Sequence, residues 1–161
     1  STLMRSSAAS DVYKRQELQS GEEKTYRALV LSNLVAIHQK TGIGRLSAYC
    51  GAVSAGAAAG AGIAYLCGGG YEEVIHTVVN ALAIVSGMVC DGAKASCAAK
   101  IASSVDAGIL GYNMYLRGQQ FYAGDGIVTK GVEATIQNIG RLGKDGMKET
   151  NEEIIKMMIS D

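Results

Sequence analysis

Proline and tryptophan are missing from this 161-residue sequence, and neither sign of charge is in excess. Lysine plus arginine and aspartate plus glutamate number 15 each, so the chain has no basic field to attract nucleic acid. The absence of proline, together with 21 glycines, favours closely approaching helices over a sheet with many turns. We therefore predict an all-α fold and no nucleic-acid partner.

The sequence also lacks closely spaced cysteine pairs. Forty positions separate Cys50 from Cys90, and seven separate Cys90 from Cys97. Structural zinc sites bring their ligands in pairs such as C-x2-C, and electron-transfer ferredoxins use short C-x2-C-x2-C runs, so neither class fits. A disulfide framework is not expected, because the sequence shows no secretory signal and the chain is neither short nor rich in loops.

Small residues surround these three cysteines, within residues 47–52 and 86–97. Thiolates in a pocket without bulky side chains are typical of a site for one large inorganic cofactor. On spacing alone a second interpretation stays open, in which the cysteines are buried and act as small hydrophobic residues. Cys67 lies outside the pattern and is interpreted as a packing residue, with a redox or ligand role as the alternative.

Two charged residues lie next to these cysteines. Asp91 is predicted to cap the helix that carries Cys97, and Lys94 to support a thiolate-bound cluster or a carboxylate by its positive charge. The alternative is an Asp91–Lys94 pair one helical turn apart, worth roughly a few tenths of a kcal/mol. A pyridoxal phosphate Schiff base at Lys94 is not expected, because no phosphate-binding loop accompanies it.

Three stretches resemble the C-terminal region of the L-cysteine desulfidase and L-serine dehydratase alpha-chain family. They are IGRLSAYCGA at 43–52, SGMVCDGAKASCAAK at 86–100 and IGRLGKDGM at 139–147. The resemblance runs from about Glu17 to the end of the chain. Its cysteine spacing is closer to the L-cysteine desulfidase branch, because the last two cysteines of the serine dehydratases are further apart.

The resemblance implies a lyase that needs no pyridoxal phosphate. Cys50, Cys90 and Cys97 would bind a four-iron, four-sulfur (4Fe-4S) cluster whose fourth iron stays open as a Lewis acid. L-cysteine would give pyruvate, ammonia and sulfide, and L-serine pyruvate and ammonia. In the family the catalytic base and much of the substrate pocket come from an N-terminal region, so this chain alone is expected to be inactive. A cytoplasmic location is expected.

Residues 1–16 are predicted to be a non-native leader. Under one choice of codons in one reading frame, residues 6–16 back-translate onto a widely used transposase sequencing adapter. A segment of that origin carries no information about the fold of the natural protein. We therefore expect residues 17–161 to be the C-terminal helical domain of a longer protein that continues upstream, with that upstream region as its partner.

Helical periodicity and helix-boundary signals divide the rest of the chain. Residues 20–23 and 150–153 have the form of capping boxes, and the first precedes a helix of about six turns that ends near Gly42. Glu72 and Glu73 begin another helix that ends at residues 86–87. A further helix passes through Val132 and Ile139, whereas residues 112–125 are expected to be a connection.

Residues 46–66 are rich in alanine and glycine and carry no charge. A membrane span would want about 20 strongly apolar residues, and the spacing of Gly56 and Gly60 is a familiar packing face in membranes. Alanine and glycine outnumber leucine, isoleucine and phenylalanine here, so we favour a buried central helix of a soluble protein, with no membrane contact. The triple glycine at 68–70 is predicted to end it.

Two other classes of function stay open. One is a helical interaction or regulatory domain without catalysis, whose cysteines only pack. The other is a small membrane component built around residues 46–66. The sequence is compatible with a homodimer, and it names no catalytic residue within this chain.

Overall fold

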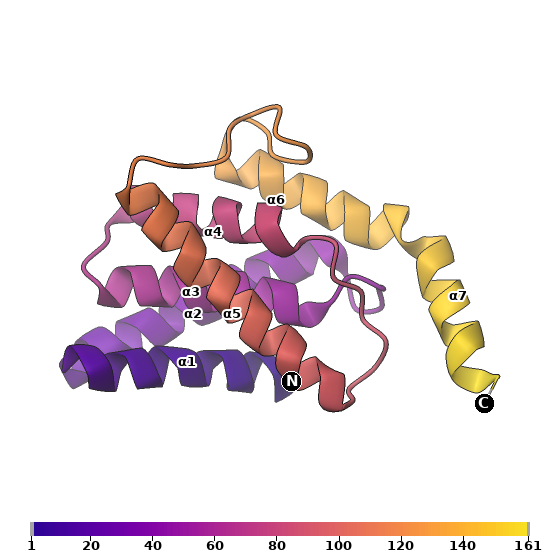
Figure 1. The fold of residues 1–161 in the computed structure, drawn as a ribbon, viewed down its shortest axis with the longest axis horizontal. Coiled ribbons are helices and arrows are strands. Elements are labelled where there is room, and N and C mark those ends of the chain that lie inside the picture. Colours follow the sequence, from indigo (N-terminus) through magenta and orange to yellow (C-terminus); the bar gives the residue numbers. More distant parts are fainter. Residues whose placement is uncertain (1, 161) are drawn as a thin grey trace.

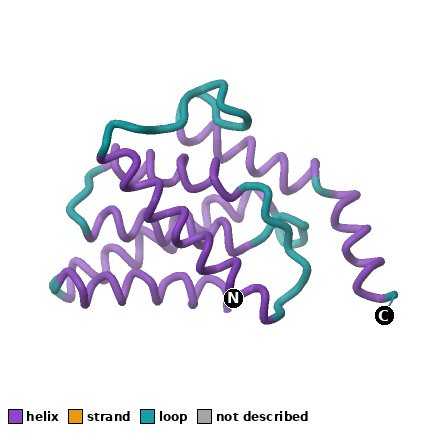
Figure 2. Tube along the Cα trace, in the orientation of Figure 1, coloured by secondary structure: helices purple, strands orange, loops and turns teal. Residues whose placement is uncertain are grey.

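The computed structural model describes the backbone of residues 2–160 and the side chains of residues 9–160. Over this range the chain forms seven α-helices and one π-helix and no strand, which confirms the predicted all-α class (Figures 1 and 2). In chain order the helices are α1 (Thr2–Leu18), α2 (Glu22–Ile43), α3 (Gly51–Leu66), α4 (Tyr71–Val85), α5 (Ala95–Leu116), α6 (Val132–Arg141), the π-helix η1 (Leu142–Gly146) and α7 (Lys148–Ile159).

Helix α3 is the buried centre of the fold. It packs against α1, α2, α4 and α5, and nearly all of its residues are buried (Figure 1). A charge-free helix can be enclosed on all sides without leaving an unpaired ion, so the prediction of a buried central helix is confirmed. Its predicted start at residue 46 is wrong: the helix begins at Gly51, and Leu46 is 90% exposed.

Small residues let α3 and α5 approach to backbone contact. A Cβ atom added at Gly60 would lie 2.7 Å from the Cα of Gly108, and one added at Gly56 would lie 2.3 Å from the Cβ of Ser104. These two contacts are one helical turn apart on each helix. The alanine- and glycine-rich composition therefore sets the distance between the two helices.

The helix boundaries differ in part from the predicted ones. Neither predicted capping box forms: Gly21 is the N-cap of α2, and Met147 is the N-cap of α7, which begins at Lys148, so Thr150 lies inside that helix. A carboxylate cap does form at α4, where Glu73 accepts a hydrogen bond from the Gly70 N–H. The stop after α3 is confirmed, because Gly68 has a positive φ and the Gly69 N–H donates to the Ala64 carbonyl.

Helix α5 extends to Leu116, beyond the predicted start of the connection at residue 112. Asn80 on α4 connects this helix to the loop that follows it. Its side-chain amide donates to the Gly111 carbonyl, and its carbonyl oxygen accepts from the Phe121 N–H. A long-range side-chain contact therefore holds the start of this loop, which Figure 2 shows running to α6.

Helix α1 contains residues 2–16 of the predicted non-native leader, and it packs against α3. Asp11 is fully buried there, and a Cβ added at Gly62 would lie 2.8 Å from its carboxylate. Neither carboxylate oxygen has a hydrogen-bond partner among the described residues. The origin of residues 1–16 stays a prediction.

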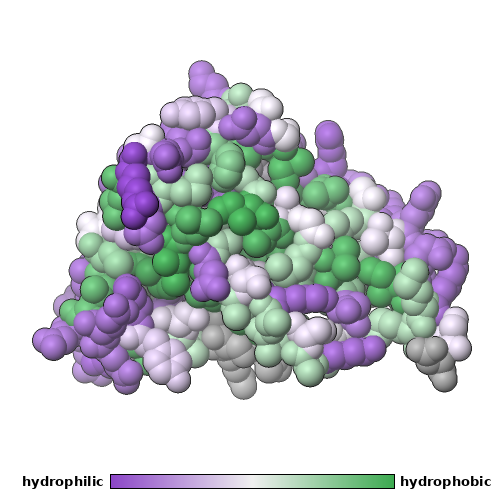
Figure 3. All heavy atoms as spheres, viewed as in Figure 1, coloured by the Kyte–Doolittle hydropathy of each residue, from purple (hydrophilic) through white to green (hydrophobic). Residues whose placement is uncertain are grey.

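Hydrophobic atoms also reach the surface. In Figure 3 a hydrophobic area crosses the middle of the visible face, where α4 and α5 lie in the same view of Figure 1. Exposed apolar residues of these helices include Ile84, Ile109 and Leu110. None of the described helices combines the length and the hydropathy that a membrane crossing requires.

Candidate functional site

Two segments far apart in the sequence pair their backbones just before α3. Tyr49 and Val89 form an antiparallel bridge. The Cys50 N–H donates to the Met88 carbonyl at 3.1 Å, and the Cys90 N–H donates to the Ala48 carbonyl at 2.7 Å. This pairing holds Cys50 and Cys90 on two neighbouring segments of backbone, although forty positions of sequence separate them. It also explains why α3 cannot begin before Gly51.

Cys97 lies in the first turn of α5, where its N–H donates to the Lys94 carbonyl at 2.9 Å. Cys50 and Cys97 are buried, whereas Cys90 is half-buried. Burial raises the pKa of the Cys50 thiol, the Ala52 amide partly offsets this, and the charges of Cys90 and Cys97 raise the pKa further. The charges of the other two thiols therefore act on Cys50 in the same direction as its burial.

The donor set has the chemistry of an iron–sulfur site. Three thiols from three segments are the soft ligands that such a cluster requires, and small residues surround them. Among the described residues, no three histidine, cysteine, aspartate or glutamate side chains are close enough to hold a single metal ion. A cluster with several irons has thiolates on different metal atoms, so its ligands lie further apart than those of one ion.

Lys100 is the charged residue that contacts this site. Its ammonium group donates to the Val89 carbonyl at 2.9 Å and to the Asp91 carboxylate. The hydrogen bond from Lys100 lowers the pKa of Asp91, and Asp91 in turn raises the pKa of Lys100. The positive charge of Lys100 also offsets a small part of the rise in the pKa of Cys50. Lys100 therefore fixes the loop that carries Cys90 and places a cation beside the thiols.

The sequence-based roles of Asp91 and Lys94 change accordingly. The prediction that Asp91 caps α5 is wrong, because Lys94 is the N-cap and no side chain caps that helix. Lys94 is exposed and forms no ion pair with a described residue, whereas Asp91 pairs with Lys100. Sequence reasoning missed Lys100, although its position one helical turn after Cys97 is a signal that could have found it.

Cys67 lies at the opposite end of α3 from Cys50. The two are the C-cap and the N-cap of a 16-residue helix, which is about 24 Å long at 1.5 Å per residue. Cys67 packs against Ala59, Ile63 and Val105, as the interpretation as a packing residue expects. It is therefore remote from the other three cysteines.

A cavity of about 630 Å³ lies beside Cys90. This volume is within the usual range of small-molecule sites. Its walls come from α2, the segment before α3, the first turns of α3, and α7. The lining residues are Ala36, Lys40, Arg45, Leu46, Ser47, Tyr49, Gly51, Ser54, Ala55, Cys90, Asn151, Ile154, Ile155 and Met158.

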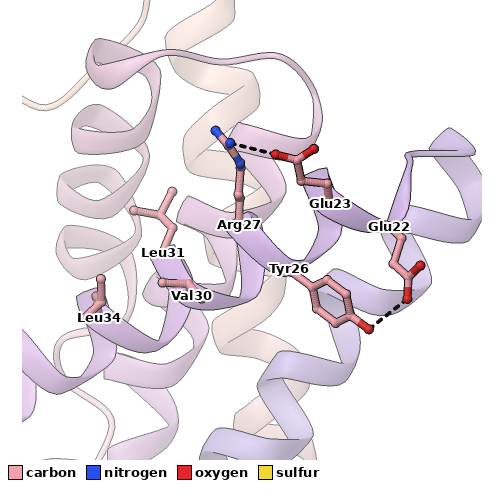
Figure 4. A pocket seen from close by; sticks show the side chains of 7 residues that line it. All are labelled: Glu22, Glu23, Tyr26, Arg27, Val30, Leu31 and Leu34. Atoms are coloured by element: carbon pink, nitrogen blue, oxygen red, sulfur yellow. Dashed lines mark hydrogen bonds and ion pairs between the residues drawn. The ribbon is translucent and has the colours of Figure 1, made fainter.

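A second hollow, of about 590 Å³, lies over the outer face of α2 (Figure 4). All seven lining residues belong to that one helix, so the hollow is an open surface rather than an enclosed site. Tyr26, Val30 and Leu34 expose 60%, 58% and 59% of their area. At the polar end of this face, Arg27 pairs with Glu23 (Figure 4). The outer face of α2 is thus an apolar stripe without a partner among the described residues.

Fold and site together define a helical domain that carries three cysteines around the N-terminus of a buried small-residue helix. The chain belongs to the serine dehydratase alpha chain family, whose family model matches residues 8–156. This match confirms the family resemblance seen in the sequence. It does not distinguish the L-cysteine desulfidase branch from the serine dehydratases.

Curated relatives carry the name UPF0597 protein. The relative from Desulfitobacterium hafniense (strain Y51) is 72% identical over 144 residues, which cover 89% of this chain and 34% of that protein. The relative from Lachnoclostridium phytofermentans is 58% identical over 139 residues, or 86% of this chain and 33% of that protein. The chain thus spans about a third of the length of these relatives. No solved structure matches the chain significantly.

Proposed function

We propose that this chain is the cluster-binding part of a cytoplasmic lyase that removes the β-substituent of L-cysteine or L-serine without pyridoxal phosphate. Membership of the serine dehydratase alpha chain family supports a lyase. The backbone pairing that brings Cys50 beside Cys90, with Cys97 in the first turn of α5, which packs against α3, supports the proposal of a 4Fe-4S cluster. The cysteine spacing resembles the L-cysteine desulfidase branch, and both L-cysteine and L-serine stay candidate substrates.

The reaction is a β-elimination followed by hydrolysis. A base takes the α-proton, the bond from Cβ to sulfur or oxygen breaks, and its electron pair leaves with sulfide or hydroxide. The aminoacrylate then reacts with water to give pyruvate and ammonia. A cluster with one open iron supplies a Lewis acid for the leaving group when it is bound. We expect the base to come from the region of the full-length protein outside this chain.

The residues of this chain hold the site in place. The Cys50 and Cys90 amides pair with the opposite segment, so neither cysteine can move without breaking a backbone hydrogen bond. Lys100 connects Val89 and Asp91, on either side of Cys90, to α5, which carries Cys97. Its charge also offsets the repulsion among three thiolates. We assign Asp91 and Lys94 the role of supporting the cluster site and not that of binding iron.

The test of this proposal uses the natural full-length protein that contains this sequence. After anaerobic reconstitution with iron and sulfide, it should release pyruvate from L-cysteine or L-serine without added pyridoxal phosphate. The metal-free protein should not. Undiminished pyruvate release by the metal-free protein would overturn the proposal.

We further propose that the apolar stripe of α2 (Tyr26, Val30, Leu34 and Ile37) packs against the other two thirds of the full-length protein. The matched part of this chain is only about a third of the length of each relative, so a large part of each protein is available to cover the stripe. An exposed apolar face of this kind marks a protein interface. This observation is also the one that favours the alternative function, a helical interaction domain.

Two matched variants test the occupant of the stripe. Leu34→Asp places a charge on the stripe, and Leu116→Asp places one at an equally exposed position on α5, at 59% and 58% exposure. Leu34→Asp should destabilise the full-length protein and leave the isolated chain unchanged in urea unfolding, whereas Leu116→Asp should change neither. If sedimentation instead shows that the isolated chain forms a dimer and that Leu34→Asp dissociates it, the stripe binds a second copy of this chain.

A further inference from the structure

The third stretch that carries the family resemblance, residues 139–147, contains no cysteine but contacts the segment that leads to Cys50. It includes the π-helix η1. A π-helix is rare, and its single turns are frequently found at functional sites. A Cβ added at Gly143 of η1 would lie 2.9 Å from the Ile43 side chain and 3.2 Å from the Cβ of Tyr49. Glycine at this position therefore allows η1 to pack directly against the residue before Cys50.

Ser47 connects η1 to this segment through its side chain. Its hydroxyl donates a hydrogen bond to the Gly143 carbonyl at 2.5 Å and accepts one from the Tyr49 N–H at 3.0 Å. A serine hydroxyl that accepts from the N–H two residues later forms an ST turn, which sets the direction of the backbone. Ser47 therefore holds the turn before Cys50 and joins it to a helix 96 positions further along the chain.

The backbone pairing of residues 48–50 with residues 88–90 is short. It consists of one isolated bridge, with the hydrogen bonds of the two cysteine amides beside it. Two paired backbone segments without further support are only marginally stable in water. Ligands of a metal site need to be held within about 0.5 Å. The segment that carries Cys50 therefore needs a second support, and the hydroxyl of Ser47 is in place to provide it.

We propose that Ser47 is a positioning residue for Cys50: its hydroxyl, held by the Gly143 carbonyl of η1, fixes the turn that sets the backbone position of Cys50. The inference rests on the proposed function, because it assigns a role to a residue that supports a cluster ligand. It also gives residues 139–147 a part in that function. They support the cluster site through Ser47 and do not bind iron.

Hydrogen exchange of the metal-free full-length protein, followed by mass spectrometry, tests the effect on the backbone. In Ser47→Ala, the peptide that contains Tyr49 and Cys50 should exchange about tenfold faster, as expected for the loss of two hydrogen bonds. Exchange in α4 should stay unchanged, because the effect is local. Ser20→Ala, at a half-buried position between α1 and α2, is the control and should exchange as the unchanged protein does. Equal rates in Ser47→Ala and the unchanged protein, or a rise of the same size in α4, would overturn the proposal.

A matched pair of variants separates the hydroxyl from the shape of the side chain. Threonine and valine have nearly the same shape, and only threonine has a hydroxyl. Ser47→Thr should therefore exchange near the rate of the unchanged protein, whereas Ser47→Val should exchange about tenfold faster at Tyr49 and Cys50. The same rate in both variants would show that the hydroxyl does not hold Cys50, and the proposal would be wrong. This comparison also decides the question if Ser47→Ala does not fold.

The other end of the contact is tested at Gly143. Gly143→Ala should move η1 away from Tyr49, because the added Cβ would lie 3.2 Å from the Cβ of that residue, and it should also speed exchange at Tyr49 and Cys50. Gly87→Ala is the matched control, since nothing lies within 4 Å of a Cβ at that position. Unchanged exchange at Tyr49 in a folded Gly143→Ala variant would contradict the role of η1.

Iron retention separates this proposal from the proposed function. In the reconstituted full-length protein, a chelator should remove iron about tenfold faster from Ser47→Ala and Ser47→Val than from Ser47→Thr or the unchanged protein, as for the loss of a residue that supports a metal ligand. If the unchanged protein takes up no iron but the exchange rates are as expected, the positioning role stands and the proposed function fails. If the unchanged protein binds a cluster, but the variants exchange and lose iron at its rate, only the positioning role fails.

Discussion

Replacing Gly56 by alanine should destabilise the fold and displace a cysteine at the same time. The added Cβ would lie 2.3 Å from the Cβ of Ser104 and 2.6 Å from its carbonyl oxygen, whereas ordinary contacts begin at 3.4 Å. The contact includes backbone, so no side-chain rotation can relieve it. Helix α5 must therefore move away from α3 by roughly 1 Å.

The expected cost is about 1–3 kcal/mol of unfolding free energy, which is typical of overpacking in a well-packed core. This is a considerable part of the roughly 5–15 kcal/mol that holds a domain folded. The displacement also moves Cys97 and Lys100, which are on α5, away from Cys50 at the start of α3. Ligand sets need to be held within about 0.5 Å, so iron retention should fall as well.

Urea unfolding followed by circular dichroism measures the first effect, and iron content after reconstitution of the full-length protein measures the second. Gly87→Ala is the control, because nothing lies within 4 Å of a Cβ at that position and its φ is not left-handed. It should be neutral or stabilise the chain by about 0.4–1 kcal/mol. If Gly56→Ala unfolds at the same urea concentration as the unchanged chain, the close packing of α3 on α5 described here is wrong.

Two further predictions concern single charged residues. Burial raises the pKa of Asp11 from 3.8 to about 7, so its contribution to stability is fully present below pH 4 and is lost as the pH rises towards 7. The free energy of unfolding should fall by up to about 4 kcal/mol between pH 4 and pH 7, as measured by urea unfolding. The unchanged chain and the exposed control Asp106→Asn should both show this fall, whereas Asp11→Asn should not. Lys100→Gln should lower the iron retained by the reconstituted full-length protein, because the hydrogen bonds to Val89 and Asp91 are lost. The exposed control Lys130→Gln should retain its iron. Equal iron content in the two variants would show that Lys100 does not support the site.

Local sequence signals predicted the helices whose boundaries are set locally. Glu72 and Glu73 mark the first turn of α4, and the glycines at 68–70 end α3, because a dipole interaction and a positive φ depend only on nearby residues. The start of α3 was not predicted, because residues 48–50 pair with residues 88–90 and no local pattern encodes that pairing.

The candidate site was predictable to a similar degree. The family of the chain, predicted from three short stretches of sequence, is confirmed, whereas the role of the cysteines stays a prediction. The role of Asp91 was misread because its partner, Lys100, lies nine positions away on the next helix.

The central claim is that Cys50, Cys90 and Cys97 bind one 4Fe-4S cluster and that Cys67 does not. Iron and acid-labile sulfide in the full-length protein, measured after anaerobic reconstitution, test it most directly. The account predicts four irons and four sulfides per chain, retained in Cys67→Ala and lost in Cys50→Ala, Cys90→Ala and Cys97→Ala. A folded protein without iron, or loss of the cluster in Cys67→Ala alone, would contradict it.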